Sequence, residues 1–291
     1  MHIYEKVLQR EEFLQEPPVL LDLGASGGLH KIWQRIAPYA VCIAFDADNR
    51  QMEQVGAARK TFRNLIIFNK AVVADSSSST EFFLTRNPYC SSTLQPYSEA
   101  LSNWAFADYF EVIEEARLET TNLGQVLSGL NLKRVDWFKA DTQGTDLRLF
   151  QSLPSPLQDR VLVAEFEPGI IDAYKGEDKL WQVMAFMDGK SYWMTDMEIK
   201  GSQRVPKDAW GHLNRIQRKF IGKFIRTAPG WAEICYMNTF VGDFDKREYL
   251  LGCVFALLKE QYGFAIKLAS KGYERSAILI LTLPTPAGGE I

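Results

Sequence analysis

Residues 19–28, with the sequence VLLDLGASGG, constrain the fold of this 291-residue chain more than any other segment. An apolar run that ends in glycines predicts a short buried strand, a tight turn and a helix beginning at about Gly28. Glycine suits such a turn because it adopts backbone angles closed to other residues and lets a ligand approach closely. The first turn of the expected helix would present free N–H groups to a carboxylate or phosphate. The segment therefore predicts a nucleotide-cofactor turn in an α/β protein.

The spacing of the glycines distinguishes between kinds of cofactor. A dinucleotide fingerprint, Gly-x-Gly-x-x-Gly, fails because Ser26 and Leu29 stand where its second and third glycines belong. A phosphate-binding loop fails too, since no Gly-Lys-Ser/Thr follows. The remaining pattern is Asp-x-Gly-x-x-Gly, formed by Asp22, Gly24 and Gly27. An acidic residue near the turn suits a cofactor with an ammonium group rather than a pyrophosphate.

Apolar strand patterns alternate with helical patterns along the chain. Strands are predicted at residues 19–23, 41–45, 65–68, 80–85, 135–140, 161–164, 192–198 and 233–237. Leu147, Phe150 and Leu153 mark one face of a helix between two of these strands. Such alternation indicates a parallel sheet covered on both faces. A long C-terminal helix is expected from about Phe244.

Carboxylates lie at or after the ends of several predicted strands. In chain order they are Asp22, Asp46, Asp75, Asp141, Glu165 and Glu167. Ligands of open α/β sheets bind outside the carboxyl ends of the strands, so we expect these side chains around one cleft. Asp46 lies about 20 residues past the glycines, where a carboxylate can accept hydrogen bonds from both hydroxyls of a ribose.

Together these residues resemble the FkbM-type family of S-adenosylmethionine-dependent methyltransferases. The matching segments, in the family's order, are residues 20–28, 45–48, 71–75, 90–94 and 138–146. The last of them, FKADTQGTD, is the most specific. Asp46 stands where the family has Glu, Ala47 where it has Pro, and Asp146 where it has Glu. The change at Asp46 keeps the ribose-binding chemistry on a shorter side chain.

The resemblance implies the class I methyltransferase (Rossmann-like) fold, a seven-stranded, mostly parallel sheet with the last strand antiparallel. It implies S-adenosylmethionine as cofactor and O-methylation of a small-molecule or glycan hydroxyl, on a sugar, glycolipid or specialised metabolite. The residues expected to bind the cofactor are Asp22, Gly24, Ala25, Ser26, Gly27, Asp46, Ala71, Asp75 and Asp141. The candidates for a general base are Asp141, Glu165 and Glu167. For Asp141 the choice between base, cofactor ligand and structural role stays open.

Net charge, apolar run length and cysteine content limit the partners and the cellular compartment that we expect for this chain. A net charge of −3 gives no overall attraction to nucleic acid or anionic membranes, and the longest apolar run is too short to span a bilayer. Four scattered cysteines without Cys-x-x-Cys spacing favour a reducing, cytoplasmic setting and predict no metal site. We expect a methyltransferase domain over residues 1–243, with core motifs at 19–167, and a C-terminal helical extension over 244–291 packed on the same domain.

Weaker features leave alternatives open. The basic amphipathic stretch at residues 215–226 suits peripheral contact with an anionic glycan, a membrane surface or RNA, although such a pattern more often belongs to a solvated helix face. Four tryptophans fit either a sugar platform or the core: Trp181, Trp193, Trp210 and Trp231. The rival functions are a nucleic-acid methyltransferase of the same fold and a non-catalytic binding protein on a retired methyltransferase fold. The segment after residue 140 lacks the Pro-Pro-aromatic turn of base-modifying enzymes, which disfavours the first rival.

Overall fold

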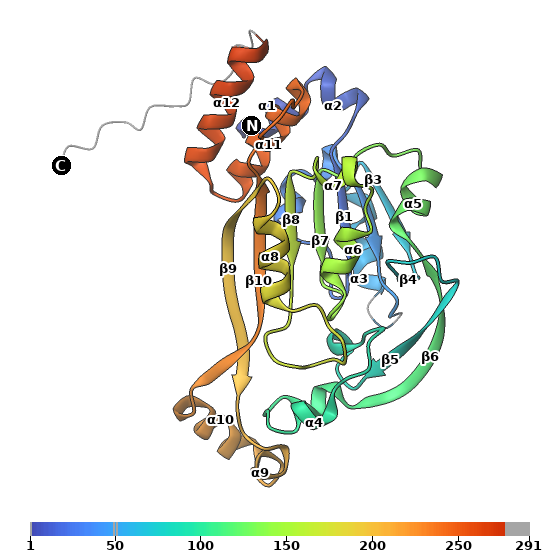
Figure 1. Cartoon of the computed structure of the whole chain (residues 1–291), viewed down its shortest axis with the longest axis vertical. Helices are drawn as coiled ribbons and strands as arrows, with labels where there is room; N and C mark the ends of the chain where they lie inside the picture. Colours follow the sequence, from blue (N-terminus) through green and yellow to red (C-terminus); the bar gives the residue numbers. More distant parts are fainter. Residues whose placement is uncertain (1, 49, 51, 277–291) are drawn as a thin grey trace, which may run out of the picture. The chain divides into compact units, whose positions relative to one another are not determined.

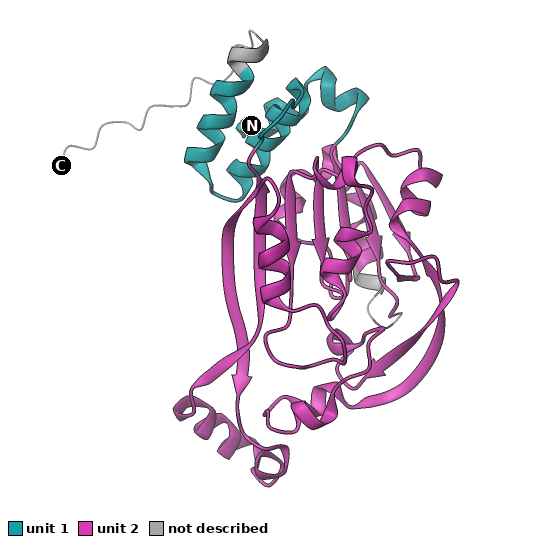
Figure 2. Cartoon of the chain, viewed as in Figure 1, with its two compact units in different colours: residues 1–17, 240–291 teal, residues 18–239 magenta. Residues whose placement is uncertain are grey.

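The structure, a computed structural model, describes residues 2–48, 50 and 52–276. The chain divides into two compact units, residues 18–239 and residues 1–17 with 240–291 (Figure 2). The N-terminal segment therefore groups with the C-terminal helices, whereas the sequence suggested a boundary at residue 243. Residues 277–291 of the expected extension lie outside the described residues. Packing of that extension on the domain expected over residues 1–243 stays a prediction.

The larger unit, residues 18–239, is built on a seven-stranded mixed sheet. In sheet order its strands are β3 (Asn64–Phe68), β2 (Val41–Phe45), β1 (Val19–Leu23), β7 (Trp137–Ala140), β8 (Val163–Phe166), β10 (Thr227–Asn238) and β9 (Tyr192–Gln203) (Figure 1). Strand β10 is antiparallel to both neighbours, while β3, β2, β1, β7 and β8 pair in parallel. The prediction of an α/β protein with a mostly parallel, seven-stranded sheet is confirmed.

Neighbouring side chains of β7 pack against helical segments on opposite faces of the sheet. Trp137 contacts Trp33 of the 3-10 helix η1 (Lys31–Arg35) edge-on, with ring centroids 5.9 Å apart. The next residue, Phe138, contacts Phe150 of α6 (Asp146–Gln151) on the other face, at 5.0 Å. All four rings are fully buried. Both faces of the sheet are therefore covered, as the alternating pattern predicted.

The remaining elements of the larger unit connect these strands. The helical segments are η2 (Ala37–Tyr39), α3 (Met52–Ala57), η4 (Ala58–Lys60), η5 (Pro88–Cys90), α4 (Ser98–Leu101), η6 (Ala107–Phe110), α5 (Leu123–Gly129), α7 (Ser155–Gln158), α8 (Leu180–Asp188), α9 (Lys207–Gly211) and α10 (Arg215–Phe224). A second sheet contains β4 (Ala71–Val72), β6 (Val112–Thr121) and β5 (Ser79–Thr85), in that order. Strand β6 is missing from the predicted strands, although polar and less polar residues alternate from Ala116 to Thr121.

The smaller unit is helical over its described residues. Its helices are α1 (Ile3–Leu8), α2 (Glu11–Gln15), α11 (Lys246–Leu258) and α12 (Tyr262–Ser276). Arg247 of α11 donates hydrogen bonds to the carbonyl oxygens of Glu16, at 2.9 Å, and Pro17, at 3.0 Å. The single helix expected from Phe244 is wrong, because the chain turns at Glu260, whose φ is 59°. No helix in residues 2–48, 50 and 52–276 is both long and apolar enough to cross a membrane.

The turn after β1 differs from the expected turn and helix. Gly28 has a φ of 111°, so no helix can begin there. The first helical residue is Lys31, and η1 is a five-residue 3-10 helix instead of an α-helix. The predicted α-helix at Gly28 is therefore wrong, and so is the predicted anion site at its first turn. What the glycines do provide is close approach between the turn and β7.

Gly24 is the residue where this approach is closest. A Cβ at Gly24 would lie 1.9 Å from the carbonyl oxygen of Asp141, and its φ of +85° already disfavours other residues. We expect Gly24→Ala to lower the free energy of unfolding by at least about 2 kcal/mol, measured by urea denaturation. Gly28→Ala is the matched control, since its φ is +111° but its Cβ would meet nothing within 4 Å. Equal losses in the two variants would contradict the close contact with Asp141.

Candidate functional site

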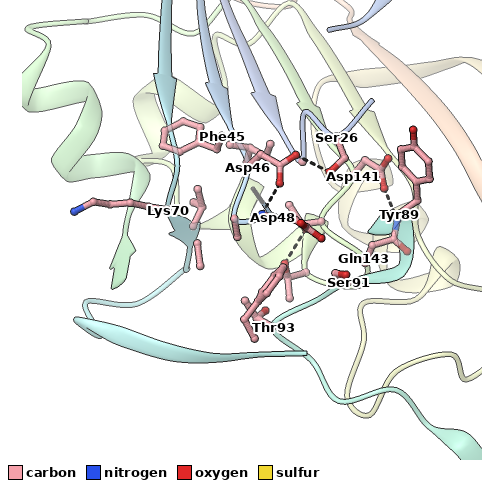
Figure 3. A pocket seen from close by; sticks show the side chains of 18 of the residues that line it. Ser26, Phe45, Asp46, Asp48, Lys70, Tyr89, Ser91, Thr93, Asp141 and Gln143 are labelled. Atoms are coloured by element: carbon pink, nitrogen blue, oxygen red, sulfur yellow. Dashed lines mark hydrogen bonds between the residues drawn. The ribbon is translucent and has the colours of Figure 1, made fainter. Parts of the chain in front are cut away.

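The carboxyl ends of β1, β2 and β7 border one cavity in the larger unit, called the first cavity below (Figure 3). Segments distant in the sequence form its walls. These are the turn after β1, the end of β2, strand β4, the loop that follows β5, and the turn after β7. The lining residues used below are Gly24, Ser26, Asp46, Asp48, Ala71, Val72, Phe82, Tyr89, Ser91, Asp141 and Gln143.

Asp46, directly after β2, is the centre of hydrogen bonding in the first cavity. Its Oδ2 accepts a hydrogen bond from the Ser26 hydroxyl at 2.6 Å, and its Oδ1 accepts one from the Asp48 amide at 2.8 Å (Figure 3). Burial raises the pKa of Asp46, because it disfavours the charged form. A carboxylate has about four acceptor positions, so Asp46 retains capacity for hydroxyl donors of a ligand.

Asp48 connects the end of β2 to the loop after β5. Its Oδ1 accepts a hydrogen bond from Arg50 Nε at 2.9 Å. The same guanidinium donates to the carbonyl oxygen of Thr85 at 3.0 Å and to the Ser91 hydroxyl at 2.9 Å. Burial would raise the pKa of Asp48, but hydrogen bonds from Arg50 outweigh it and lower this pKa. The segment at residues 90–94, which carries part of the family resemblance, is thereby held at the cavity wall.

The turn after β7 holds the Asp141 carboxylate at this wall. Gln143 and Gly144 have φ values of 56° and 106°, and a positive φ is uncommon for glutamine. The Gln143 side-chain amide donates to Asp141 Oδ1 at 2.6 Å (Figure 3). The Gln143 main-chain carbonyl oxygen accepts from the Ser92 hydroxyl at 2.8 Å. These bonds stabilise a backbone conformation that would otherwise be unfavourable.

Asp146 links the ends of β7 and β8. Its Oδ1 accepts hydrogen bonds from the Thr142 amide at 2.9 Å and the Thr142 hydroxyl at 2.6 Å. Its Oδ2 accepts from the Glu167 amide at 2.7 Å. Asp146 stands where the resembled family has Glu, and the shorter side chain still reaches both partners.

A largely buried cation lies among the carboxylates at the ends of β1, β7 and β8. Lys139 Nζ is 3.1 Å from Asp22 Oδ1, and Asp22 is fully buried. Burial alone would lower the pKa of Lys139, but the charges of Asp22, Asp141 and Glu167 raise it. Lys139 therefore remains charged, and its ammonium holds Asp22 beneath the glycine turn.

The pKa values of Asp141 and Glu167 are both raised, that of Glu167 further. Burial raises the pKa of Asp141 to about 6. Burial, reinforced by the nearby charge of Asp141, raises the pKa of Glu167 to about 9. At pH 7 Asp141 is ionised and can accept a proton, whereas Glu167 is protonated and can donate a hydrogen bond.

A second cavity of about 660 Å³ adjoins the first and shares Ser26, Tyr89, Asp141 and Gln143 with it. This volume is within the usual range for small-molecule sites. Rings and carboxylates dominate its lining. The rings are Tyr89, Phe106, Tyr109, Phe110, Tyr174, Trp210 and Trp231, and the carboxylates are Asp141, Glu167, Glu177 and Glu233. The described residues that line it include no lysine, arginine or histidine.

The structure brings six of the predicted site residues to these cavities. Gly24, Ser26, Asp46, Ala71, Asp141 and Glu167 line one cavity or both. Asp22, Ala25, Gly27 and Asp75 line neither. A Cβ at Gly27 would lie 2.9 Å from the ring of Tyr89, so Gly27 admits that ring to the wall. Asp75 is exposed and accepts a hydrogen bond from the Ser77 amide at 2.9 Å.

Glu165 occupies a different position from the one predicted. Strand β8 begins at Val163 instead of residue 161, so Glu165 lies inside the strand rather than at its end. Its Oε2 accepts a hydrogen bond from Trp137 Nε1 at 3.1 Å and is 3.4 Å from His30 Nε2. Glu165 lines neither cavity, which leaves Asp141 and Glu167 as the candidate bases beside them.

Several contributors to the site were not predicted from the sequence. Lys139 was detectable, since a lysine between Phe138 and Ala140 interrupts a buried apolar strand. Tyr174 gives no such signal, because it comes from the loop after β8. Its hydroxyl bonds to the Cys90 carbonyl oxygen at 2.8 Å and to Gln143 Oε1 at 3.0 Å.

Comparison with known proteins found no matching family model, no matching curated protein and no matching solved structure. What this chain does must therefore be inferred from its own residues.

The pairing of Lys139 with Asp22 predicts strong coupling between the two residues. Lys139→Met leaves the Asp22 carboxylate buried without its cation, so we expect the free energy of unfolding to fall by about 3–5 kcal/mol. The double variant Lys139→Met/Asp22→Leu removes both charges and should be more stable than Lys139→Met alone. Urea denaturation of the two single variants and the double variant measures this. Additive losses would contradict the ion pair.

Proposed function

We propose that this chain is an S-adenosylmethionine-dependent O-methyltransferase of the FkbM type, acting on a hydroxyl of a sugar, glycolipid or specialised metabolite. The observation that carries the proposal is a pair of adjoining cavities that share Asp141. One is lined by the glycine turn and the Asp46 carboxylate, and the other by aromatic rings. A group-transfer enzyme needs this arrangement, because its two substrates must meet at one wall.

The topology supports the proposal. A seven-stranded sheet in which only the last strand, β10, runs antiparallel is the arrangement that the family resemblance implied. Three of the resembling segments, residues 20–28, 45–48 and 138–146, end at the first cavity from adjacent strands. A fourth, residues 90–94, is held there by Arg50. We therefore infer the class I methyltransferase fold.

The lining of the first cavity offers groups that would bind the nucleoside part of S-adenosylmethionine. Asp46 would accept hydrogen bonds from the ribose hydroxyls with the lone pairs that Ser26 and Asp48 leave available. Ala71, Val72 and Phe82 form an apolar part of the same lining and would contact the adenine. They take the place that the sequence suggested for the Asp75 region.

The remaining wall of the first cavity fits the methionine part. Gly24 and Ser26 bring the backbone of the turn to the lining, and Asp141 supplies an ionised carboxylate for the ammonium group. The positive φ of Gly24 and its contact with Asp141 keep these two walls together. When bound, S-adenosylmethionine supplies a methyl group on a sulfonium, an electrophile for an oxygen nucleophile.

The second cavity would bind the acceptor. Trp210 and Trp231 are two of the four tryptophans that suggested a sugar platform, and both line this cavity. Aromatic faces pack against the C–H surfaces of sugars, while carboxylates accept hydrogen bonds from their hydroxyls. Since its described lining contains carboxylates and no cationic side chain, the cavity favours uncharged acceptors over phosphates or uronic acids.

Asp141 would act as the general base, and Glu167 would orient the acceptor. A neutral alcohol is a weak nucleophile, and Asp141, ionised at pH 7, would accept its proton. Glu167, protonated at pH 7, would donate a hydrogen bond to the acceptor and orient it. Gln143 positions the Asp141 carboxylate by donating to its Oδ1. The rest of the rate enhancement would come from holding the two substrates in line.

We also infer a cytoplasmic location. The four cysteines, Cys42, Cys90, Cys235 and Cys253, are all free and buried. Free thiols throughout a chain are typical of reducing compartments.

Cofactor binding is tested by calorimetric titration with S-adenosylmethionine and, separately, with NADH. We expect micromolar affinity for the first and none for the second. Asp46→Asn should weaken binding at least about tenfold, because the ribose hydroxyls lose a charged acceptor. Asp75→Asn is the matched control, since this carboxylate is exposed and does not line the cavity. A preference for NADH, or no binding of either compound, would overturn the proposal.

The pH dependence of methyl transfer tests the roles of Asp141 and Glu167. With a hydroxylated acceptor found by screening, turnover should rise with pH as Asp141 ionises, below pH 6 because the cofactor's ammonium group stabilises the carboxylate, and fall above about 9, where Glu167 loses its proton. Asp141→Asn should abolish turnover. Glu167→Gln keeps a hydrogen-bond donor that cannot ionise, so it should retain activity and lose the alkaline limb. An unchanged alkaline limb in Glu167→Gln would contradict the role given to Glu167.

A further inference from the structure

Helix α10 (Arg215–Phe224) carries an apolar stripe on its exposed side. Ile216, Phe220 and Phe224 are four residues apart and therefore lie on one face of the helix. Their side chains are 80%, 64% and 74% exposed, respectively. The Phe220 and Phe224 rings contact each other, with centroids 4.9 Å apart. Three large apolar side chains are thus exposed together on a short helix.

A basic stripe runs beside the apolar one. Arg215, Lys219 and Lys223 have the same spacing and are also exposed. The sequence contains no Asp or Glu from residue 209 to residue 232. Within the described part of the chain, none of these three cations forms an ion pair with a carboxylate. The exposed side of α10 is therefore both apolar and uniformly positive, on a chain whose net charge is −3.

Hydrogen bonds at the start of α10 stabilise the helix itself, and one bond near its end joins it to β9. Asn214 caps the helix by accepting hydrogen bonds from the amides of Ile216 and Gln217. Arg218 donates to the carbonyl oxygen of Leu213 at 2.9 Å, and Gln203 of β9 donates to that of Gly222 at 3.3 Å. None of these bonds uses a side chain of either exposed stripe, so the stripes are available to a partner.

We propose that α10 docks on the surface of an anionic lipid bilayer. A helix that lies in the membrane interface buries an apolar face among the acyl chains while its cations contact anionic headgroups. The two stripes of α10 have this chemistry. RNA would engage the cations but leave Ile216, Phe220 and Phe224 in water. A second copy of α10 would bring like charges together, which disfavours self-association.

The position of α10 relates this surface to the second cavity. Helices α9 and α10 follow one another at the end of the long strands β9 and β10 (Figure 1). Trp210 of α9 lines the second cavity, and so does Gln203, which bonds to α10. Docking would hold this wall of the cavity at the bilayer surface. The docking itself does not depend on the reaction that the site performs.

Vesicle co-sedimentation of the full chain tests the proposal. The protein should bind vesicles of phosphatidylcholine with phosphatidylglycerol, bind pure phosphatidylcholine much more weakly, and be released by salt. Lys219→Glu/Lys223→Glu should weaken binding to the mixed vesicles by roughly fivefold or more for each cation lost. Phe220→Ser/Phe224→Ser should weaken it at least as much, since the apolar contact is lost.

The matched control is Trp181→Ser in α8, because Trp181 is also 68% exposed but lies outside α10. It should bind the mixed vesicles like the parent chain. Thermal unfolding must give the same midpoint for each α10 variant as for the parent, so that lost binding reports the surface. Equal binding to both kinds of vesicle, or normal binding by the α10 variants, would overturn the proposal. Failure to bind either kind of vesicle would overturn it as well, and the occupant would then be RNA if the lysine variant abolishes a gel shift, or a second copy if the phenylalanine variant abolishes dimers in sedimentation velocity.

Discussion

The ion pair between Lys139 and Asp22 is the interaction on which the candidate site depends. The ends of β1 and β7 bring Asp22 and the ionised Asp141 near one another, and two carboxylates in a poorly solvated place repel. The Lys139 ammonium, 3.1 Å from Asp22 Oδ1, offsets that repulsion. Burial raises the pKa of Asp141, and the Lys139 charge limits the rise to about 6. Without this cation the pKa of Asp141 would rise further, and less of the ionised form that acts as base or as partner of an ammonium group would be present.

Local sequence patterns predicted the sheet well and the segments between strands less well. Strands β1 and β2 have the bounds predicted, residues 19–23 and 41–45. Short continuous apolar runs are typical of strands that are buried on both faces of a sheet. The prediction of an α-helix after Gly24 was wrong because the same apolar spacing is compatible with a 3-10 helix. The positive φ of Gly28 prevents an α-helix from beginning there. Strand β6 was missed since its side chains are largely exposed and carry no apolar run.

The site was predictable where a side chain follows directly from a strand end. Asp46 and Asp141 are such residues, and both line the first cavity. Glu165 illustrates how a small error in a boundary matters, since a strand that ends at Phe166 keeps this side chain among Trp137 and His30. Tyr174 lies far along the chain from the residues that it contacts, so its position follows from tertiary packing alone. Sequence spacing therefore predicts which side chains lie at the carboxyl edge of the sheet. The residues that line the second cavity depend on how the loops pack.

The contact between Gly24 and Asp141 explains why the two cavities share a wall. Gly24 lets the turn after β1 lie against the backbone of Asp141, directly after β7, at a distance that any Cβ would prevent. Asp141 is then fixed from three directions: by Gly24 at its carbonyl group, by Gln143 at its carboxylate, and by β1 through its amide, which donates to Leu23. Asp141 lines both cavities, with its carboxylate held by the Gln143 side chain. A carboxylate held in this way can pair with an ammonium group on one side and accept a hydrogen bond from a hydroxyl on the other. The positive φ values of Gly24, Gln143 and Gly144 allow the two turns to make this contact.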